Sequence, residues 1–302
     1  MPKGEGHMEA CFADRAVEAM GAGRVDLVQM EVPDLNGALR GKFVAAKKVV
    51  GGSKSAICTV LYQFTPVDDV WASEHSSYEN GFPDVLGVPD LSTAVELPWR
   101  QGMAAVIYDV HYPDGAPFPL APRNVLKRVA GRFAQTGYAP MFGVEFEAFV
   151  FHADREALAT GRHHDLVSLG RMHNAYRLTE SEEARELGAE FIRRMRGIGI
   201  TVEVFHTELG LGAIEFALAY LGAVQGGDQS EAFLWREHLP GEDRGGGIGN
   251  GVVRVPHLDV VFLCHFADFA GERERVGRRA KEGVAHRVHG VAKDILVEPF
   301  QT

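Results

Sequence analysis

Residues 143–151 read GVEFEAFVF, with Glu145 and Glu147 two positions apart in an otherwise apolar segment. In a β-strand, successive side chains point to opposite faces, so both carboxylates would share one face, roughly 7 Å apart. On a solvent-facing strand such a pair needs no special role. On a central strand, which the apolar neighbours favour, the carboxylates need cations to offset their burial.

Two further glutamates bracket a glycine-bearing turn in ELGLGAIE, residues 208–215. Glycine lets the backbone reverse sharply, so this turn could aim Glu208 and Glu215 into one cavity, although an ordinary hairpin with exposed acids has the same pattern. Four glutamates on strands expected to be neighbours favour a site for a hard cation such as Mg²⁺. An alternative is the acid/base pair of a glycoside hydrolase, whose carboxyl groups lie roughly 5 to 9.5 Å apart.

Periodicity and turn residues predict the elements that carry these glutamates. Apolar residues at helical spacing predict a helix over 8–22, and Asn36-Gly37 predicts a tight hairpin after it. We place a domain boundary near residue 115, which divides the chain into 1–115 and 116–302, with α/β or α+β architecture in the second part. The other expected elements are strands at 56–61 and 104–110, a long loop at 65–99, a helix at 122–133, a strand at 141–151, a helix at 181–196, and strands at 200–206 and 214–219.

Composition and charge narrow the class of protein. The 302 residues include 41 acidic and 31 basic side chains, for a formal charge of -10, so a broad surface for nucleic acid phosphates is not expected. Three scattered cysteines are too few for a disulfide framework or a thiolate zinc site and fit a reducing cytoplasm. We also expect no secretion signal and no membrane span, because no apolar run approaches roughly 18 residues.

Several segments in order resemble the glutamine synthetase family. The ExE strand and the E-x-G-x-G-x-x-E turn are similar to that family's metal-binding strands, and the resemblance is clear to about residue 228. The further matching segments are DLNGALRGKFV (34–44), GFPDVLGVPDLSTAVELPW (81–99), AVIYDVHYPDGAPFPLAPRNVLKRV (105–129), YRLTESEEA (176–184), GIGITVEVFHTE (197–208) and IEFALA (214–219).

The resemblance implies an α+β fold, in which an N-terminal β-grasp-like domain precedes a partial catalytic domain of curved antiparallel sheet with flanking helices. It also implies a cytoplasmic homo-oligomeric ring with active sites between neighbouring subunits. The activity implied is an ATP- and Mg²⁺- or Mn²⁺-dependent ligase. The metals would offset charge during γ-phosphoryl transfer to glutamate, and ammonia or an amine would attack the resulting acyl phosphate.

The resemblance also implies roles for single residues. Glu147, Glu208 and Glu215 would hold the metal near the glutamate, and Glu145 would contribute to the metal on the nucleotide phosphates. In the long loop, Asp84 and Asp69 would lie near a neighbouring subunit's active site and help bind or deprotonate the amine.

The chain also departs from the family pattern. Gly212-Ala213 replaces Gly-Gln in the turn, and neither a His-x-His-x-Ser element nor a clear Asn-Arg segment is present. Residues 270–300 could be the family's late helix and strand, with a solvated helix at 272–288 as the alternative. Otherwise 247–256 could be the arginine segment, with Arg254 contacting substrate or nucleotide, because family order does not permit both.

Two outcomes follow from these departures. With one recognisable set of metal ligands and no identified cations for phosphate, we expect weak magnesium binding and little or no ligase turnover. The alternative to a working ligase is a truncated or inactive family member that serves as an assembly or regulatory subunit.

Overall fold

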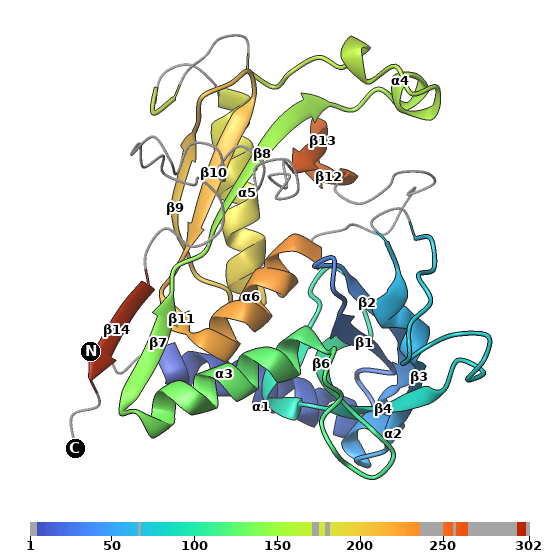
Figure 1. Cartoon of the computed structure of the whole chain (residues 1–302). Helices are drawn as coiled ribbons and strands as arrows, with labels where there is room; N and C mark the ends of the chain where they lie inside the picture. The colour runs from blue at the N-terminus through green and yellow to red at the C-terminus, as the bar shows by residue number, and fades with distance from the viewer. Residues whose placement is uncertain are drawn as a thin grey trace, which may run out of the picture.

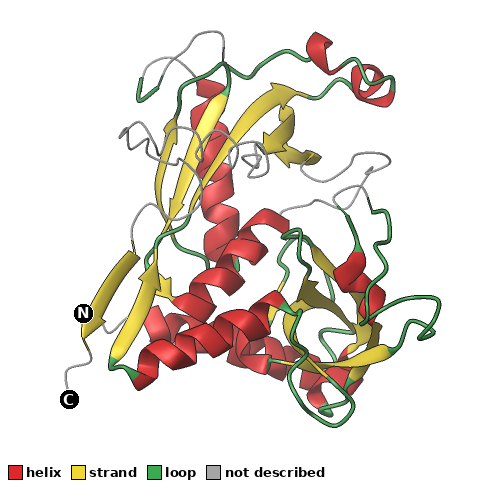
Figure 2. Cartoon of the chain, viewed as in Figure 1, coloured by secondary structure: helices red, strands yellow, loops and turns green. Residues whose placement is uncertain are grey.

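The structure is a computed structural model with mixed α+β architecture (Figures 1 and 2). A sheet of the N-terminal part and an antiparallel sheet of the second part lie on either side of helices (Figure 2). The structure describes residues 5–65, 68–170, 175–178, 182–235, 250–255, 258–264 and 295–299.

The first sheet has six strands in the order β2-β1-β6-β4-β3, with β5 paired to β6. Strands β1 and β6 are parallel, and the other pairs in this sheet are antiparallel. The elements of this part are α1 (Glu5–Gly21), β1 (Leu27–Pro33), β2 (Leu39–Ala45), α2 (Ala46–Val50), β3 (Ser55–Cys58), the 3-10 helix η1 (Thr59–Gln63), β4 (Asp84–Pro89), the 3-10 helix η2 (Leu91–Thr93), β5 (Val95–Glu96) and β6 (Met103–His111).

Alternation along β1 explains how this sheet packs. Val28, Met30 and Val32 are buried in the N-terminal core, whereas Gln29 and Glu31 project from the opposite face. The predicted hairpin is confirmed, because Gly37 has the positive φ of 74° that the turn requires. The β-grasp assignment of this part stays a prediction, as does the domain boundary near residue 115.

The second part contains an antiparallel sheet in the order β12-β13-β8-β10-β9 and a smaller one in the order β11-β7-β14. The curved antiparallel sheet with flanking helices that the family resemblance implies is present in this part (Figure 1). Its elements are α3 (Pro122–Gln135), β7 (Tyr138–Phe142), β8 (Glu145–His152), α4 (Arg155–Ala159), the 3-10 helix η3 (His163–Asp165), α5 (Glu182–Gly197), β9 (Val202–Thr207), β10 (Ala213–Leu218), β11 (Leu221–Gly222), α6 (Ala223–Trp235), β12 (Asn250–Val255), β13 (Leu258–Cys264) and β14 (Ile295–Pro299).

Three predicted elements need correction. The strand expected over 141–151 is two strands, β7 and β8, which separate at Gly143, where a Cβ would lie 2.9 Å from the Tyr220 ring. The loop expected over 65–99 contains β4, η2 and β5, because Val85 and Val95 are buried against β6. The strand expected over 56–61 ends at Cys58, where η1 begins.

Aromatic side chains fix which face of the second sheet is buried. Phe146, Phe205 and Phe216 occupy register positions on neighbouring strands and join the core beside α5 and α6. The Phe216 ring lies 4.6 Å from that of Phe191 of α5, and the Phe146 ring lies 4.4 Å from that of Phe233 of α6. The alternate residues of these strands therefore face away from the helices.

The length and apolar character of the helices were compared with those of a membrane span. Within the described residues, none is both long and apolar enough to cross a membrane.

Candidate metal centre

The strand register brings the glutamates of the sequence motifs onto the face opposite the aromatic core. Glu215 of β10 lies directly across from Glu147 of β8, and its other neighbour in the register is His206 of β9. Glu145 lies across from Ala217, two positions along the same face. The sharing of one face by Glu145 and Glu147 follows from the alternation that the sequence predicts.

A compact group of ligand atoms lies on this face. One atom from each of His206, Glu208 and Glu215 lies within 4.8 Å of the others, the one such group found among the described residues. His206 Nε2 is 3.8 Å from Glu215 Oε1, and His206 Nδ1 is 3.8 Å from Glu208 Oε1. Glu215 is only 4% exposed, and a carboxylate so deeply buried requires a cation or hydrogen-bond donors nearby. The arrangement can therefore hold a divalent cation.

Glu147 and Glu145 stand beside this group and are not part of it. Glu147 is exposed, and Glu145 is half-buried. Side chains directly opposite in an antiparallel pair have Cβ atoms about 4.5–5.5 Å apart, so Glu147 is within reach of a metal bound by Glu215. Their roles as ligands stay predictions.

His206 was missed by the sequence reading. It lies two residues before Glu208, so the same alternation that pairs Glu145 with Glu147 could have found it. The Tyr176 ring lies 4.6 Å from the imidazole, and Nδ1 is 3.2 Å from the Thr207 carbonyl oxygen. These contacts orient Nε2 toward Glu215.

The glycine-bearing turn between Glu208 and Glu215 is closely packed. Gly212 has a φ of 72°, and a Cβ there would lie 2.5 Å from the Val150 carbonyl oxygen and 2.6 Å from Ser168 Oγ. The Glu208 backbone N–H donates to the Ala213 carbonyl oxygen across the turn. The turn is therefore held in one conformation by β8 and the segment that follows it.

We predict that Gly212→Ala lowers the free energy of unfolding by more than about 2 kcal/mol. The new Cβ would clash with backbone atoms, and alanine is also strained at a positive φ. The matched control is Gly161→Ala, which has a φ of 70° but open space around the Cβ. It should lose about 1 kcal/mol. Urea unfolding of both variants checks this, and equal losses would show that the close contacts at Gly212 are unimportant.

The other predicted site residues lie elsewhere. Asp84 begins β4, and Asp69 lies in the segment before β4, so both belong to the N-terminal part. Both residues are exposed. Arg254 is paired with Asp259 in the β12–β13 ladder, but its side chain lies outside the described part. The helix predicted over 272–288 also lies outside the described residues.

An ionic network around Arg123 was not foreseen. This residue is only 5% exposed and lies on α3. Its guanidinium donates to Asp228 through two bonds of 2.7 Å, to Asp109 at 2.5 Å and to Asp90 at 2.8 Å. Lys127 adds a bond of 2.6 Å to Asp109. The network therefore ties α6 to the β6 strand and to the start of η2.

Electrostatics within this network follow from its contacts. Burial would raise the pKa of Asp90, but hydrogen bonds from Ser92 and Arg123 and the charges of Arg123 and Lys127 outweigh it and lower that pKa to about 2. Burial would lower the pKa of Arg123, but the hydrogen bonds to Asp228 and the charges of Asp228 and Asp109 outweigh it and raise that pKa. Asp90 and Arg123 are therefore both charged at neutral pH.

Part of the chain is similar to a known protein family. Residues 119–236 match the family described as "Glutamine synthetase, catalytic domain". The chain is similar to the glutamine synthetases over this stretch. The match includes all three members of the ligand group.

Individual relatives support this relationship. The chain is 26% identical to a glutamate–isopropylamine ligase of Pseudomonas sp, over 68% of this chain and 46% of that protein. It is 29% identical to a γ-glutamylethanolamide synthetase of Streptomyces coelicolor, over 70% of this chain and 47% of that protein. The chain thus spans less than half the length of these curated relatives.

A solved structure, "Apo GmaS without ligand", shares the fold with a TM-score of 0.57 and 22% identity. The likeness covers 73% of this chain and 48% of that one.

Proposed function

We propose that this relative of the glutamine synthetases works as an ATP-dependent ligase that joins the γ-carboxylate of glutamate to ammonia or a small amine through an acyl phosphate. The observation that carries the proposal is the group formed by His206, Glu208 and Glu215, on the sheet face opposite the aromatic core, within the stretch that matches the catalytic domain. The names of the relatives, which include a glutamate–isopropylamine ligase and a γ-glutamylethanolamide synthetase, support it.

The donor set fits a divalent cation. Two carboxylates suit Mg²⁺ or Mn²⁺, and the imidazole favours Mn²⁺ of the two. When bound, the cation would supply charge neutralisation for phosphoryl transfer. We assign Glu208, Glu215 and His206 as its ligands, Glu147 as a further ligand from the opposite strand, and Glu145 as the group that contributes at the nucleotide phosphates.

The residues of the chain prepare this site before any ligand binds. A proton on His206 Nδ1, donated to the Thr207 carbonyl oxygen, leaves the lone pair of Nε2 toward Glu215. The packed turn at Gly212 fixes the separation of Glu208 and Glu215. Both effects lower the reorganisation that binding requires.

The remaining parts of the proposal concern assembly. Asp84 lies in the N-terminal sheet and Asp69 lies in the segment before it, and neither belongs to the ligand group. We propose that a neighbouring copy in a cytoplasmic homo-oligomeric ring brings them to the active site, where they bind or deprotonate the amine. The N-terminal part would then serve as the β-grasp-like domain that makes this contact.

We predict that Glu215→Gln weakens Mn²⁺ binding by roughly 100-fold, because it removes the most buried anionic ligand. Titration calorimetry or the electron paramagnetic resonance signal of free Mn²⁺ measures the affinity. The control is Glu203→Gln, an exposed glutamate of β9, the strand that carries His206; this variant should bind normally. Equal affinity in both variants would remove Glu215 from the metal site.

Turnover is tested on the purified chain with ATP, Mg²⁺ or Mn²⁺, glutamate and hydroxylamine, by formation of γ-glutamyl hydroxamate. Activity that disappears in Glu215→Gln supports the ligase. Metal binding that depends on Glu215 without hydroxamate formation supports the alternative, an inactive family member with an assembly or regulatory role. Absence of both metal binding and turnover contradicts the proposal.

A further inference from the structure

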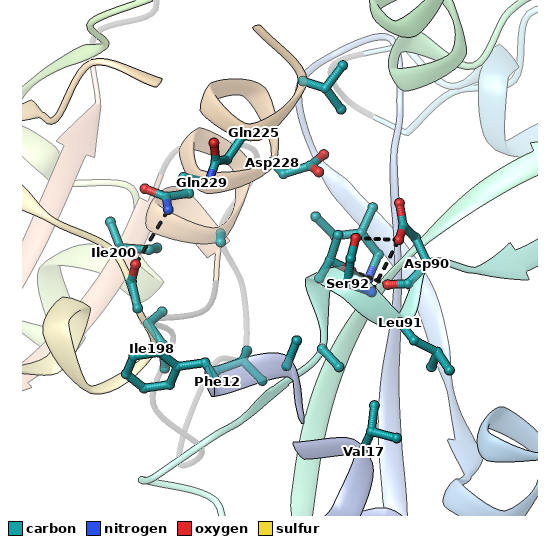
Figure 3. Close-up of a pocket in the computed structure, with 18 of the residues that line it drawn as sticks. Phe12, Val17, Asp90, Leu91, Ser92, Ile198, Ile200, Gln225, Asp228 and Gln229 are labelled. Carbon is teal, nitrogen blue, oxygen red and sulfur yellow. Dashed lines mark hydrogen bonds between the residues drawn. The ribbon is translucent and has the colours of Figure 1, made fainter. Parts of the chain in front are cut away.

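A cleft of about 1010 Å³ lies between α1, η2, the turn after α5 and α6 (Figure 3). This volume is at the upper end of the range of small-molecule sites, about 300–1,000 Å³. None of the three metal-group residues lines it. The cleft is therefore a separate feature of the molecule.

The walls of the cleft are mainly apolar. Phe12 and Val17 of α1 line one part, and Ile198 and Ile200 line another, with Leu91 of η2 across from them (Figure 3). The Phe12 ring lies against Gly199, where a Cβ would be 3.1 Å from the ring. Such walls favour a ligand with an aliphatic or aromatic body.

One end of the cleft is polar and carries excess negative charge. Asp90 and Asp228 line it together with Arg123 and Lys127 (Figure 3 labels the two aspartates). With Asp109 behind them, this network has three carboxyl groups beside two cations. Ser92 lies at the same end and donates its hydroxyl to Asp90 at 2.6 Å.

The mouth of the cleft adds to this charge. Asp14 and Glu18 of α1 line it, are exposed, and lie four residues apart on one helix face. Glu18 is paired with Arg24 at 3.0 Å, an exposed contact that offsets part of its charge. The lining as a whole contains four acidic and two basic side chains.

Because apolar walls lead to an end lined by Asp90 and Asp228, we propose that the cleft binds an organic ammonium ion. The apolar body would pack between Phe12 and Ile200, and the ammonium group would lie at the end formed by Asp90 and Asp228. The low pKa of Asp90 keeps that carboxylate charged at neutral pH. The proposal does not rest on ligase activity, because no residue of the metal group contributes to the cleft.

The test compares three probes of the same shape with the full chain near neutral pH. Phenethylamine is a cation, 2-phenylethanol is neutral and phenylacetate is an anion. Titration followed by ligand-observed NMR should rank their affinities in that order. High salt should reduce the preference for the cation, because screening weakens exposed charge interactions.

Gln225 provides matched variants. It lines the cleft on α6, three residues before Asp228 and therefore on the same helix face. Gln225→Glu should tighten phenethylamine binding about tenfold and Gln225→Lys should weaken it about tenfold, because each changes the charge within several ångströms of the ammonium group. Gln225→Met should change it by no more than about twofold.

The outcomes are distinct. Saturable binding with this order of probes and variants supports the proposal. No saturable binding of phenethylamine, equal affinity for all three probes, or equal effects of the glutamate and lysine variants overturns it. Because the readout is binding of a probe at this cleft, failure here leaves the metal-dependent ligase proposal unchanged, and the reverse also holds.

Discussion

Replacing Arg123 with methionine is expected to lower the free energy of unfolding by about 3–5 kcal/mol. The guanidinium is almost fully buried and bonds to three aspartates, so its removal leaves partly buried carboxyl groups facing one another beside Lys127. Methionine fills similar space without the charge. Urea unfolding followed by tryptophan fluorescence measures the loss.

A surface arginine with similar partners is the control. Arg162 pairs with Glu156 and with Asp165, each at 3.1 Å, but is 44% exposed. Arg162→Met should lose no more than about 1 kcal/mol, because solvent screens exposed ion pairs. The double variant Arg123→Met with Asp228→Leu should be less destabilised than the sum of the single variants. Equal losses for Arg123→Met and Arg162→Met would show that burial does not strengthen the network.

Local sequence signals predicted much of the framework. The Asn36-Gly37 hairpin, the helix begun by Pro122 and the strand over 104–110 all depend on neighbouring residues, and the structure confirms them. Alternation also predicted that Glu145 and Glu147 share a face. In these cases the information lies within a few residues, so it can be read without knowledge of the fold.

Other features depend on contacts that sequence spacing does not reveal. Asp228 lies 105 residues from Arg123, and no local pattern indicates that they meet. The break between β7 and β8 depends on Tyr220, which packs against Gly143 from a distant part of the chain. His206 is different, because its spacing from Glu208 contained the signal and was not used. Tertiary packing explains the first two omissions, whereas the third required only the same alternation rule.

The environment of Glu231 leads to the second prediction, which concerns how the stability of the protein depends on pH. This α6 residue has Oε2 shielded from solvent with no hydrogen-bond partner among the described residues. Burial first, and then the charges of Asp34, Glu31 and Asp228, together raise its pKa to about 8. Glu31 and Asp34 are 1% and 2% exposed and come from β1 and the hairpin that follows it. The carboxyl group is therefore held in its protonated form at neutral pH.

We predict that the wild type becomes less stable relative to Glu231→Gln as the pH rises. Because the folded-state pKa of about 8 exceeds the unfolded value of 4.5, the folded chain binds the proton more tightly. Its stabilising contribution is fully present below pH 4.5 and is lost as the pH approaches 8, at up to about 1.4 kcal/mol per pH unit. Glutamine resembles the protonated acid and cannot ionise, so the two proteins should be similar in stability at low pH and the variant more stable above pH 8.

Urea unfolding of both proteins across this pH range gives the difference in their free energies of unfolding directly, and this difference cancels the titration of all other groups. Glu156→Gln, an exposed glutamate, should show a flat difference from wild type. A flat difference for Glu231→Gln as well would mean that Glu231 is ionised in the folded protein at neutral pH and is matched by a cation.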